Sequence, residues 1–91
     1  MAVGIDIGTT SVKAVAADAE GTVLARARVP HAVMTPRAGA FEHDIDVAWR
    51  ANVLEALAQV ASGREVAAVN VAAMVPSLGA VRGDGTAAGP G

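Results

Sequence analysis

The hydrophobic and polar positions in the N-terminal third of the chain predict three short strands joined by tight turns. Apolar and β-branched residues dominate the segments Val3–Ile7, Ser11–Ala17 and Thr22–Val29. Between them lie Gly8-Thr9-Thr10 and Asp18-Ala19-Glu20-Gly21, which have the composition of tight turns. Strands connected this closely pair with their neighbours, so we expect an antiparallel meander.

The third strand indicates which side of the meander faces water. Along Thr22–Val29, small apolar residues alternate with a face that carries Arg26 and Arg28. We interpret the arginines as a solvated face and the segment as an edge strand. The next segment, Pro30–Phe41, contains two prolines and a glycine without periodicity, and it is expected to be a loop.

Residues Asp44 to Ser62 follow the helix period. Asp44 suits the N-cap, because its carboxylate can accept hydrogen bonds from the free amides of the first turn, and Gly63 suits the position after the helix. The predicted apolar stripe consists of Trp49, Val53, Leu57 and Val60, with Leu54, Ala58 and Ala61 beside it. The residues expected largely outside the stripe are Asn52, Glu55, Gln59 and Ser62.

The segment after the helix predicts a buried strand. Val66–Ala73 is an almost continuous apolar run, which is typical of a strand covered on both faces. A right-handed crossover through the helix lays it parallel to Val3–Ile7. The expected fold class is α/β, with the order β-β-β-α-β and a mixed sheet that has Val3–Ile7 in its middle. Leu78–Arg82 is a candidate for one more short strand, and 83–91 is expected to be an irregular tail.

Composition and layout together predict an incomplete domain. Hydrophobic residues make up 53% of the chain, with one Phe, one Trp and no Tyr, and Ala and Val supply most of them. Small side chains each contribute little, at about 25 cal/mol per Å² of buried apolar area. One sheet face and the edge along 66–73 have no cover in a chain this short. We therefore expect residues 1–91 to be the incomplete N-terminal part of a larger domain.

Charge and composition argue against several partners. Seven basic and nine acidic residues give a formal charge of −2, and no Lys/Arg run favours nucleic acid or an anionic membrane. The absence of cysteine excludes disulfides and thiolate metal sites. No signal-peptide pattern and no apolar stretch approaching about 18 residues is present, so the expected compartment is the cytoplasm.

Asp6 is the strongest candidate for chemistry. It lies in an apolar strand, where a carboxylate costs several kcal/mol unless it is paired, hydrogen-bonded or bound to a cation. Mg²⁺ held through water would satisfy it. The adjoining backbone amides of Gly8-Thr9-Thr10-Ser11 form a concavity suited to an anion, and Lys13 adds positive charge. The alternative is an ordinary hairpin turn whose amides donate to Asp6. Two other phosphate-loop motifs are absent, because the chain has no Gly-x-x-x-x-Gly-Lys-Ser/Thr and no Gly-x-Gly-x-x-Gly after a strand.

Three stretches resemble known proteins, and the second and third of them point to carbohydrate kinases. Residues 4–15, closed by Asp18-Ala19-Glu20-Gly21, are similar to the first phosphate motif of the actin-like ATPase superfamily. Residues 36–44 followed by Trp49 resemble the Gly-x-x-Glu-x-Asp-Pro…Trp pattern of FGGY carbohydrate kinases, with Ile45 in place of the proline. Residues 70–78 and then 83–85 resemble the strand and hairpin that follow. Because the stretches occur in order, the chain is identified as an N-terminal fragment of an FGGY kinase, xylulose kinase-like.

The resemblance implies a fold and a set of roles. The fold is a partial ribonuclease H-like domain of the actin-like ATPase type, and the ligands are ATP and Mg²⁺. Asp6 orients Mg²⁺ and the phosphates. The implied phosphate contacts are Gly8, Thr9, Thr10, Ser11 and Lys13. Met74 and Val75 stand where xylulose kinases have a Met-His pair near the sugar. The general base is expected downstream of this chain, so no catalytic residue is assigned within it.

The implied activity is transfer of the γ-phosphate of ATP to a hydroxyl of a pentulose or similar sugar or polyol. The segment 72–76 favours the pentulose branch, because glycerol kinases carry Asn-Gln-Arg-Glu-Thr there. The 91 residues alone are expected to be inactive and to bind ATP weakly or not at all, and a homodimer is one option for the parent enzyme. Two alternatives stay open: a non-catalytic anion-binding module, and a piece of a chaperone or actin-like ATPase.

The two histidines and the tryptophan are expected to have no role in the chemistry. His43, between Glu42 and Asp44, is expected in a solvated loop, and no partner is evident for His31. Trp49 is expected to pack in the core.

Overall fold

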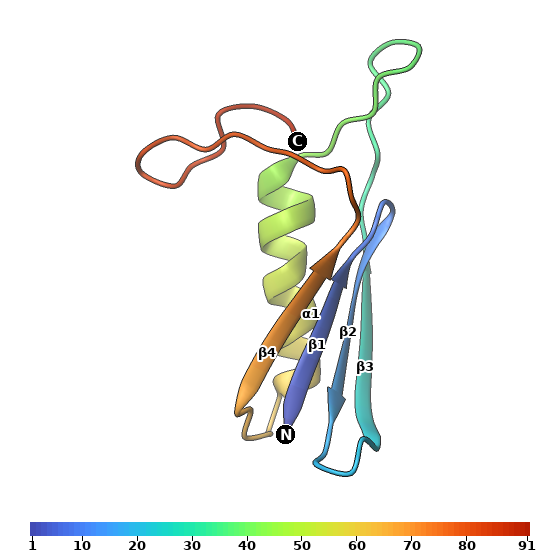
Figure 1. The fold of residues 1–91 in the computed structure, drawn as a ribbon, viewed down its shortest axis with the longest axis vertical. Helices are drawn as coiled ribbons and strands as arrows, with labels where there is room; N and C mark the ends of the chain where they lie inside the picture. The colour runs from blue at the N-terminus through green and yellow to red at the C-terminus, as the bar shows by residue number, and fades with distance from the viewer.

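The computed structural model describes residues 1–91 and contains the predicted elements in the predicted order (Figure 1). A strand, a hairpin partner and an edge strand come first, followed by one continuous helical segment and a final strand. Their bounds are β1 Ala2–Ile7, β2 Ser11–Ala17, β3 Val23–Pro30, η1 Ile45–Ala51, α1 Asn52–Ala61 and β4 Ala68–Ala73.

The four strands form one mixed sheet in the order β3-β2-β1-β4. β1 pairs antiparallel with β2, and β2 pairs antiparallel with β3, which confirms the meander. β4 pairs parallel with β1, so the helical segment is the crossover between them. The central position predicted for the first strand is therefore confirmed. In Figure 1, β1, β3 and β4 all point toward the same end of the sheet, where the hairpin turn after β1 also lies.

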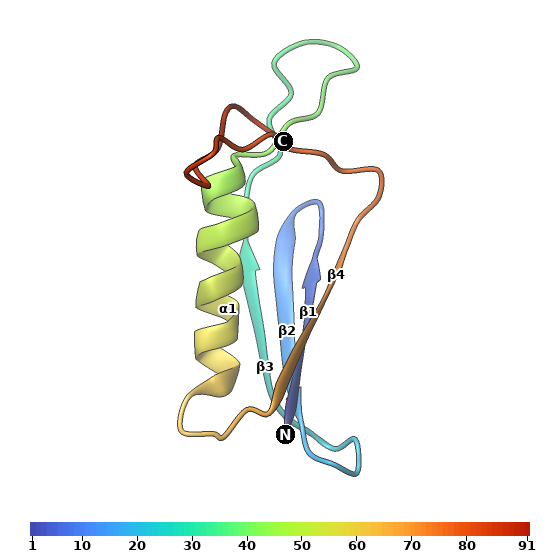
Figure 2. The same cartoon turned by 60° about the vertical axis from the view of Figure 1, so that its left-hand side comes forward.

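α1 covers one face of this sheet, and the other face has no layer over it (Figure 2). The core consists of the inward-facing strand residues and two helix residues: Val3, Ile5, Val12, Ala14, Ala16, Val29, Ala56 and Val60. The side chains that alternate with them along β1 and β2 point to the uncovered face. Arg26 and Arg28 are exposed on β3, as the alternation predicted.

The buried face of the helix differs from the predicted stripe. Its buried residues are Ala48, Asn52, Ala56 and Val60, while Trp49, Val53 and Leu57 flank them and are half-buried. Leu54 is exposed. Small alanines allow the helix to approach the sheet closely, so the contact is centred on them. Asn52, predicted outside the stripe, is buried because its amide donates to the carbonyl of Pro30 at 3.2 Å.

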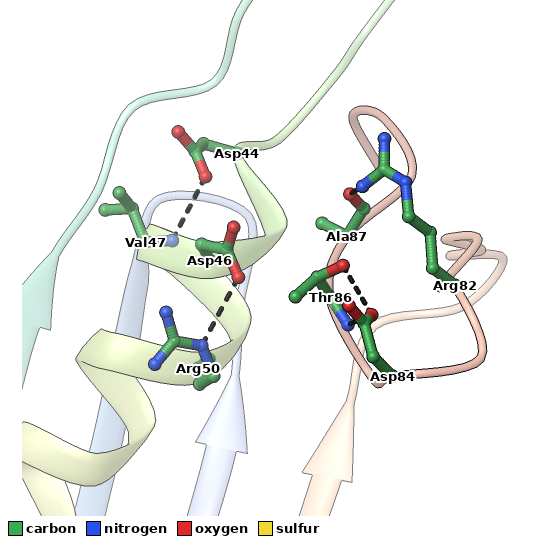
Figure 3. Close-up of polar contacts among 8 residues, drawn as sticks. All are labelled: Asp44, Asp46, Val47, Arg50, Arg82, Asp84, Thr86 and Ala87. Carbon is green, nitrogen blue, oxygen red and sulfur yellow. Dashed lines mark hydrogen bonds and ion pairs between the residues drawn. The ribbon is translucent and has the colours of Figure 1, made fainter.

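The helix ends follow the predicted capping, although its first turns are wider than expected. Asp44 caps the N-terminus, with its carboxylate accepting from the N–H of Val47 at 3.2 Å (Figure 3). η1 is π-helical, and the N–H of Asn52 donates to the carbonyl of Val47, five residues back. Gly63 follows the helix with φ of +67°, as glycine at this position predicts. Neither helical element has the length and apolar character needed to cross a membrane.

Two predictions about the C-terminal third are wrong. β4 is exposed along its whole length, because it is the sheet edge and α1 packs mainly over β1, β2 and β3. Leu78–Arg82 forms no strand, and its only ladder contact is a single bridge between Val81 and Ala87. The tail nevertheless has fixed local contacts. Asp84 accepts from the hydroxyl and the N–H of Thr86, which lowers the pKa of this carboxyl (Figure 3).

We expect a larger side chain at the centre of the helix–sheet contact to destabilise the chain. Ala56 has no exposed surface, so Ala56→Leu should lower the free energy of unfolding by about 1–3 kcal/mol through overpacking. Ala58→Leu, on the exposed side of the same helix, should change it by less than about 0.5 kcal/mol. Urea unfolding followed by circular dichroism measures both, and equal effects would contradict the assigned helix face.

Candidate functional site

Four segments far apart in the sequence meet at the end of the sheet where β1 finishes (Figure 1). They are the turn between β1 and β2, the chain after β3, the residues before η1 and the chain after β4. Backbone bonds join two of them to the β1–β2 hairpin: the N–H of His31 donates to the carbonyl of Thr10 at 2.9 Å, and that of Met74 donates to the carbonyl of Ile7 at 3.1 Å. The turn is therefore held from several sides.

The turn itself is tight. The N–H of Gly8 donates to the carbonyl of Ser11 at 2.9 Å, which leaves Thr9 and Thr10 as the two loop residues. A Cβ atom at position 8 would lie 3.0 Å from that same carbonyl oxygen, closer than an ordinary contact. Glycine is thus needed at position 8 because of space.

Two backbone amides of the turn have no partner in the chain. Neither the N–H of Thr9 nor that of Thr10 donates a hydrogen bond, and both residues are exposed. Adjacent unpaired N–H groups in a turn form a concavity with partial positive charge, which binds anionic oxygen. The two amides are therefore free to donate to a ligand, which the predicted phosphate contacts require.

Two histidines contact this turn, although their positions in the sequence predicted no such contact. Nε2 of His31 lies 3.0 Å from the carbonyl oxygen of Gly8, and Nε2 of His43 lies 2.8 Å from that of Thr9. The two rings meet edge to face, with centroids 5.2 Å apart. The only signal in the sequence is that the chain's two histidines bracket the loop between β3 and the helix.

The expectation for His43 is wrong. The residue is 6% exposed and does not lie in a solvated loop. Its ring packs between that of His31 and that of Trp49, whose centroid is 6.0 Å away. Its backbone also exchanges two hydrogen bonds with Gly91. Proximity to Glu42 and Asp44 in sequence suggested solvent, whereas the fold turns the imidazole inward against the hairpin.

Asp6 lies on the uncovered face of the sheet, so the expectation that its carboxylate is buried is wrong. It alternates with Ile5, which faces α1, and no layer covers the opposite face. Lys13 is its direct cross-strand neighbour on β2, and both side chains are exposed. They form no ion pair with each other, since the chain's ion pair joins Arg50 and Asp46. Together with Asn70 they line an open hollow of about 350 Å³.

Of the remaining predicted residues, Ser11 and Met74 form a cluster with the turn, whereas Val75 lies apart from it. Ser11 is 6% exposed and closes the turn through its carbonyl, so the hydroxyls near the surface are those of Thr9 and Thr10. Met74 belongs to the same cluster, because its sulfur accepts from the hydroxyl of Thr9 at 3.1 Å. Val75 is 89% exposed and contacts none of the other predicted residues through a hydrogen bond.

The residues present suit Mg²⁺ only when it arrives with a ligand of its own. No cluster of three or more His, Cys, Asp or Glu side chains occurs in the chain. A single carboxylate, that of Asp6, faces the hollow. Mg²⁺ commonly uses one or two carboxylates and takes its other ligands from water and substrate phosphates. The donor set therefore fits Mg²⁺ bound to a polyphosphate.

Comparison with known proteins identifies a set of relatives. Residues 1–80 match the N-terminal domain of the FGGY family of carbohydrate kinases. The chain is 40% identical over 70 residues to a glycerol kinase of Beutenbergia cavernae, across 77% of this chain and 14% of that protein. A glycerol kinase of Nocardia farcinica is 37% identical over 70 residues, with the same coverage.

Solved structures agree with the fold. The xylulose kinase from Rhodospirillum rubrum superimposes with a TM-score of 0.87 at 29% identity, over 97% of this chain and 19% of that one. Gluconate kinase from Lactobacillus acidophilus superimposes with a TM-score of 0.87 at 22% identity, over 98% of this chain and 18% of that one. The predicted fold class, part of a ribonuclease H-like domain of the actin-like ATPase type, is confirmed. The chain spans 14% of the length of the curated relatives it matches.

We expect Gly8 and Gly4 to respond differently to the same added methyl group. Gly8→Ala should lower the free energy of unfolding by about 1–2 kcal/mol, because the new Cβ crowds the Ser11 carbonyl. Gly4→Ala places its Cβ 3.7 Å from Val15, an ordinary contact on the open face. It should be neutral or stabilising by up to about 1 kcal/mol. Thermal unfolding of both variants tests this, and a Gly8→Ala chain as stable as wild type would contradict the geometry of the turn.

Proposed function

The chain belongs to the FGGY family of carbohydrate kinases, and on that premise we propose that it forms the phosphate-gripping part of an ATP-dependent sugar or polyol kinase. The enzyme transfers the γ-phosphate of ATP to a hydroxyl of its acceptor. The observation that supports this most is the pair of unpartnered amides at Thr9 and Thr10. The strands on either side of this turn carry an exposed carboxylate, Asp6, and an exposed ammonium group, Lys13. These groups match the needs of a metal-bound polyphosphate.

Each residue has a separate task in this proposal. The amides of Thr9 and Thr10, with the hydroxyls of the same residues, bind phosphate oxygens. Gly8 and Ser11 close the turn, and Lys13 neutralises phosphate charge from β2. Asp6 orients the hydrated Mg²⁺. When bound, Mg²⁺ supplies neutralisation of the charge that spreads over the phosphoryl oxygens during transfer.

The kinase proposal is favoured over the two alternatives by the family match across residues 1–80. A generic anion-binding module needs only the turn, and a chaperone or actin-like ATPase shares only the hairpin motif. We propose that the 91 residues alone lack kinase activity, because the resemblance to FGGY kinases implies a general base downstream of this chain. The cytoplasm remains our prediction for the compartment, and a homodimer remains one option for the parent enzyme.

The relatives differ in the acceptor that they phosphorylate, according to their names. The curated proteins quoted above are glycerol kinases, whereas the solved structures are a xylulose kinase and a gluconate kinase. We propose a pentulose, because the segment 72–76 lacks the Asn-Gln-Arg-Glu-Thr typical of glycerol kinases and keeps Met74 of a xylulose kinase-like Met-His pair. The 40% identity to a glycerol kinase supports glycerol as the competing acceptor.

A kinase assay on the product of the complete reading frame tests the function. Wild type should phosphorylate one of D-xylulose, D-ribulose, gluconate or glycerol, with a pentulose giving the highest kcat/KM. Asp6→Asn should lower kcat about a hundredfold, because the metal loses the charge that orients it. Asp46→Asn removes the same charge from an exposed helix position and should leave kcat unchanged.

Three outcomes would contradict parts of this proposal. Phosphorylation of none of the four acceptors would reject the kinase. Preference for glycerol would reject only the pentulose assignment. A reading frame that ends at Gly91 and whose product binds Mg-ATP in the micromolar range would reject the view that the chain needs further structure to act.

A further inference from the structure

The two histidine contacts fall on successive peptide groups of the turn. His31 contacts the carbonyl oxygen of Gly8, which belongs to the peptide linking Gly8 and Thr9. His43 contacts the carbonyl oxygen of Thr9, which belongs to the peptide linking Thr9 and Thr10. The N–H groups of these same two peptides are the ones at Thr9 and Thr10 that lack a partner in the chain.

Peptide geometry couples each contact to one free amide. In a planar trans peptide the C=O and N–H bonds point in opposite directions. A carbonyl held toward an imidazole therefore turns the N–H of the same peptide to the other side. Holding the carbonyls of Gly8 and Thr9 against His31 and His43 directs the amides of Thr9 and Thr10 away from the histidines, where an anion can meet both.

The two histidines are partly or fully buried on one side of the turn. A carbonyl only accepts, so both imidazoles carry their proton on Nε2 when they make these bonds. Nδ1 of His31 is buried without a partner. The edge-to-face packing of the two rings, with Trp49 behind His43, fixes their orientation.

We propose that His31 and His43 are positioning residues for phosphate binding. They hold two consecutive peptide planes of the turn so that the Thr9 and Thr10 amides converge on one phosphate. The hydrogen bonds from the imidazoles also polarise these two peptide groups, which makes their N–H groups stronger donors. This inference rests on the proposed function of the turn. It assigns the histidines no contact with the nucleotide and no proton transfer.

Glutamine and methionine substitutions separate the hydrogen bond from packing. The two side chains have similar length and volume, but only glutamine offers an N–H near the position of the histidine Nε2. The set is His31→Gln and His31→Met, with His43→Gln and His43→Met as the second pair. His31 is half-buried and His43 buried, so the first pair remains informative if the second disturbs folding.

The first measurement needs no phosphate. In the wild-type complete kinase, long-range ¹H–¹⁵N NMR spectra should show both rings as the Nε2–H tautomer. The ¹³C resonance of the Gly8 carbonyl should move upfield in His31→Met and stay close to wild type in His31→Gln. The Thr9 carbonyl should respond in the same way to the His43 pair. Equal shifts in the Gln and Met members of each pair would overturn the inference.

The second measurement tests whether the two histidine–carbonyl hydrogen bonds affect nucleotide binding in the complete kinase. Each Met variant should raise KM for Mg-ATP about tenfold, roughly the effect of one lost charge-assisted hydrogen bond, with little change in KM for the sugar. Each Gln variant should restore most of the affinity. An active wild type whose KM for Mg-ATP is the same in Met and Gln variants would overturn the positioning role alone. An inactive wild type would instead reject the proposed function, whatever the carbonyl resonances show.

Discussion

The orientation of two peptide groups in a four-residue turn is the constraint on which the candidate site depends. Their carbonyls face inward to His31 and His43 at 3.0 and 2.8 Å, and their amides have no partner in the chain. This arrangement needs the end of β1, the chain after β3 and the start of the helix in one place. The β-β-β-α-β order brings them there because β1, β3 and β4 all finish at that end of the sheet (Figure 1).

The two faces of the sheet carry different kinds of residue: one face holds the apolar core, and the other holds the candidate binding residues. The face under α1 holds small apolar residues packed around Ala56 and Val60, and it carries the stability of the chain. The opposite face presents Asp6 and Lys13 side by side without pairing them. Strand alternation alone decides this division: a residue that points away from the helix in β1 or β2 faces water here. Because Asp6 and Lys13 form no ion pair with each other on this open face, both charges are available to a metal and a polyphosphate.

The order of strands and helix and the position of the hairpin turn could be predicted from the sequence, because local patterns of residues determine them. Alternation and turn composition gave the meander, and the apolar run at 66–73 gave the parallel strand beside β1. Asp44 and Gly63 marked the helix ends. The burial of Asp6 and of β4 was predicted wrongly, since an apolar run does not tell which faces are covered. The histidine contacts could not be foreseen, because they join residues 23 and 34 positions apart in sequence and depend on how a loop without periodicity folds back.

The candidate site depends on hydrogen bonds from the amides of the turn to phosphate. Hydrogen–deuterium exchange on the complete kinase, with and without Mg²⁺ and a non-hydrolysable ATP analogue, tests this directly. Exchange in a peptide that spans residues 7–12 should slow when the nucleotide binds, because the Thr9 and Thr10 amides then gain acceptors. Bound nucleotide that leaves exchange in this peptide unchanged would contradict the account.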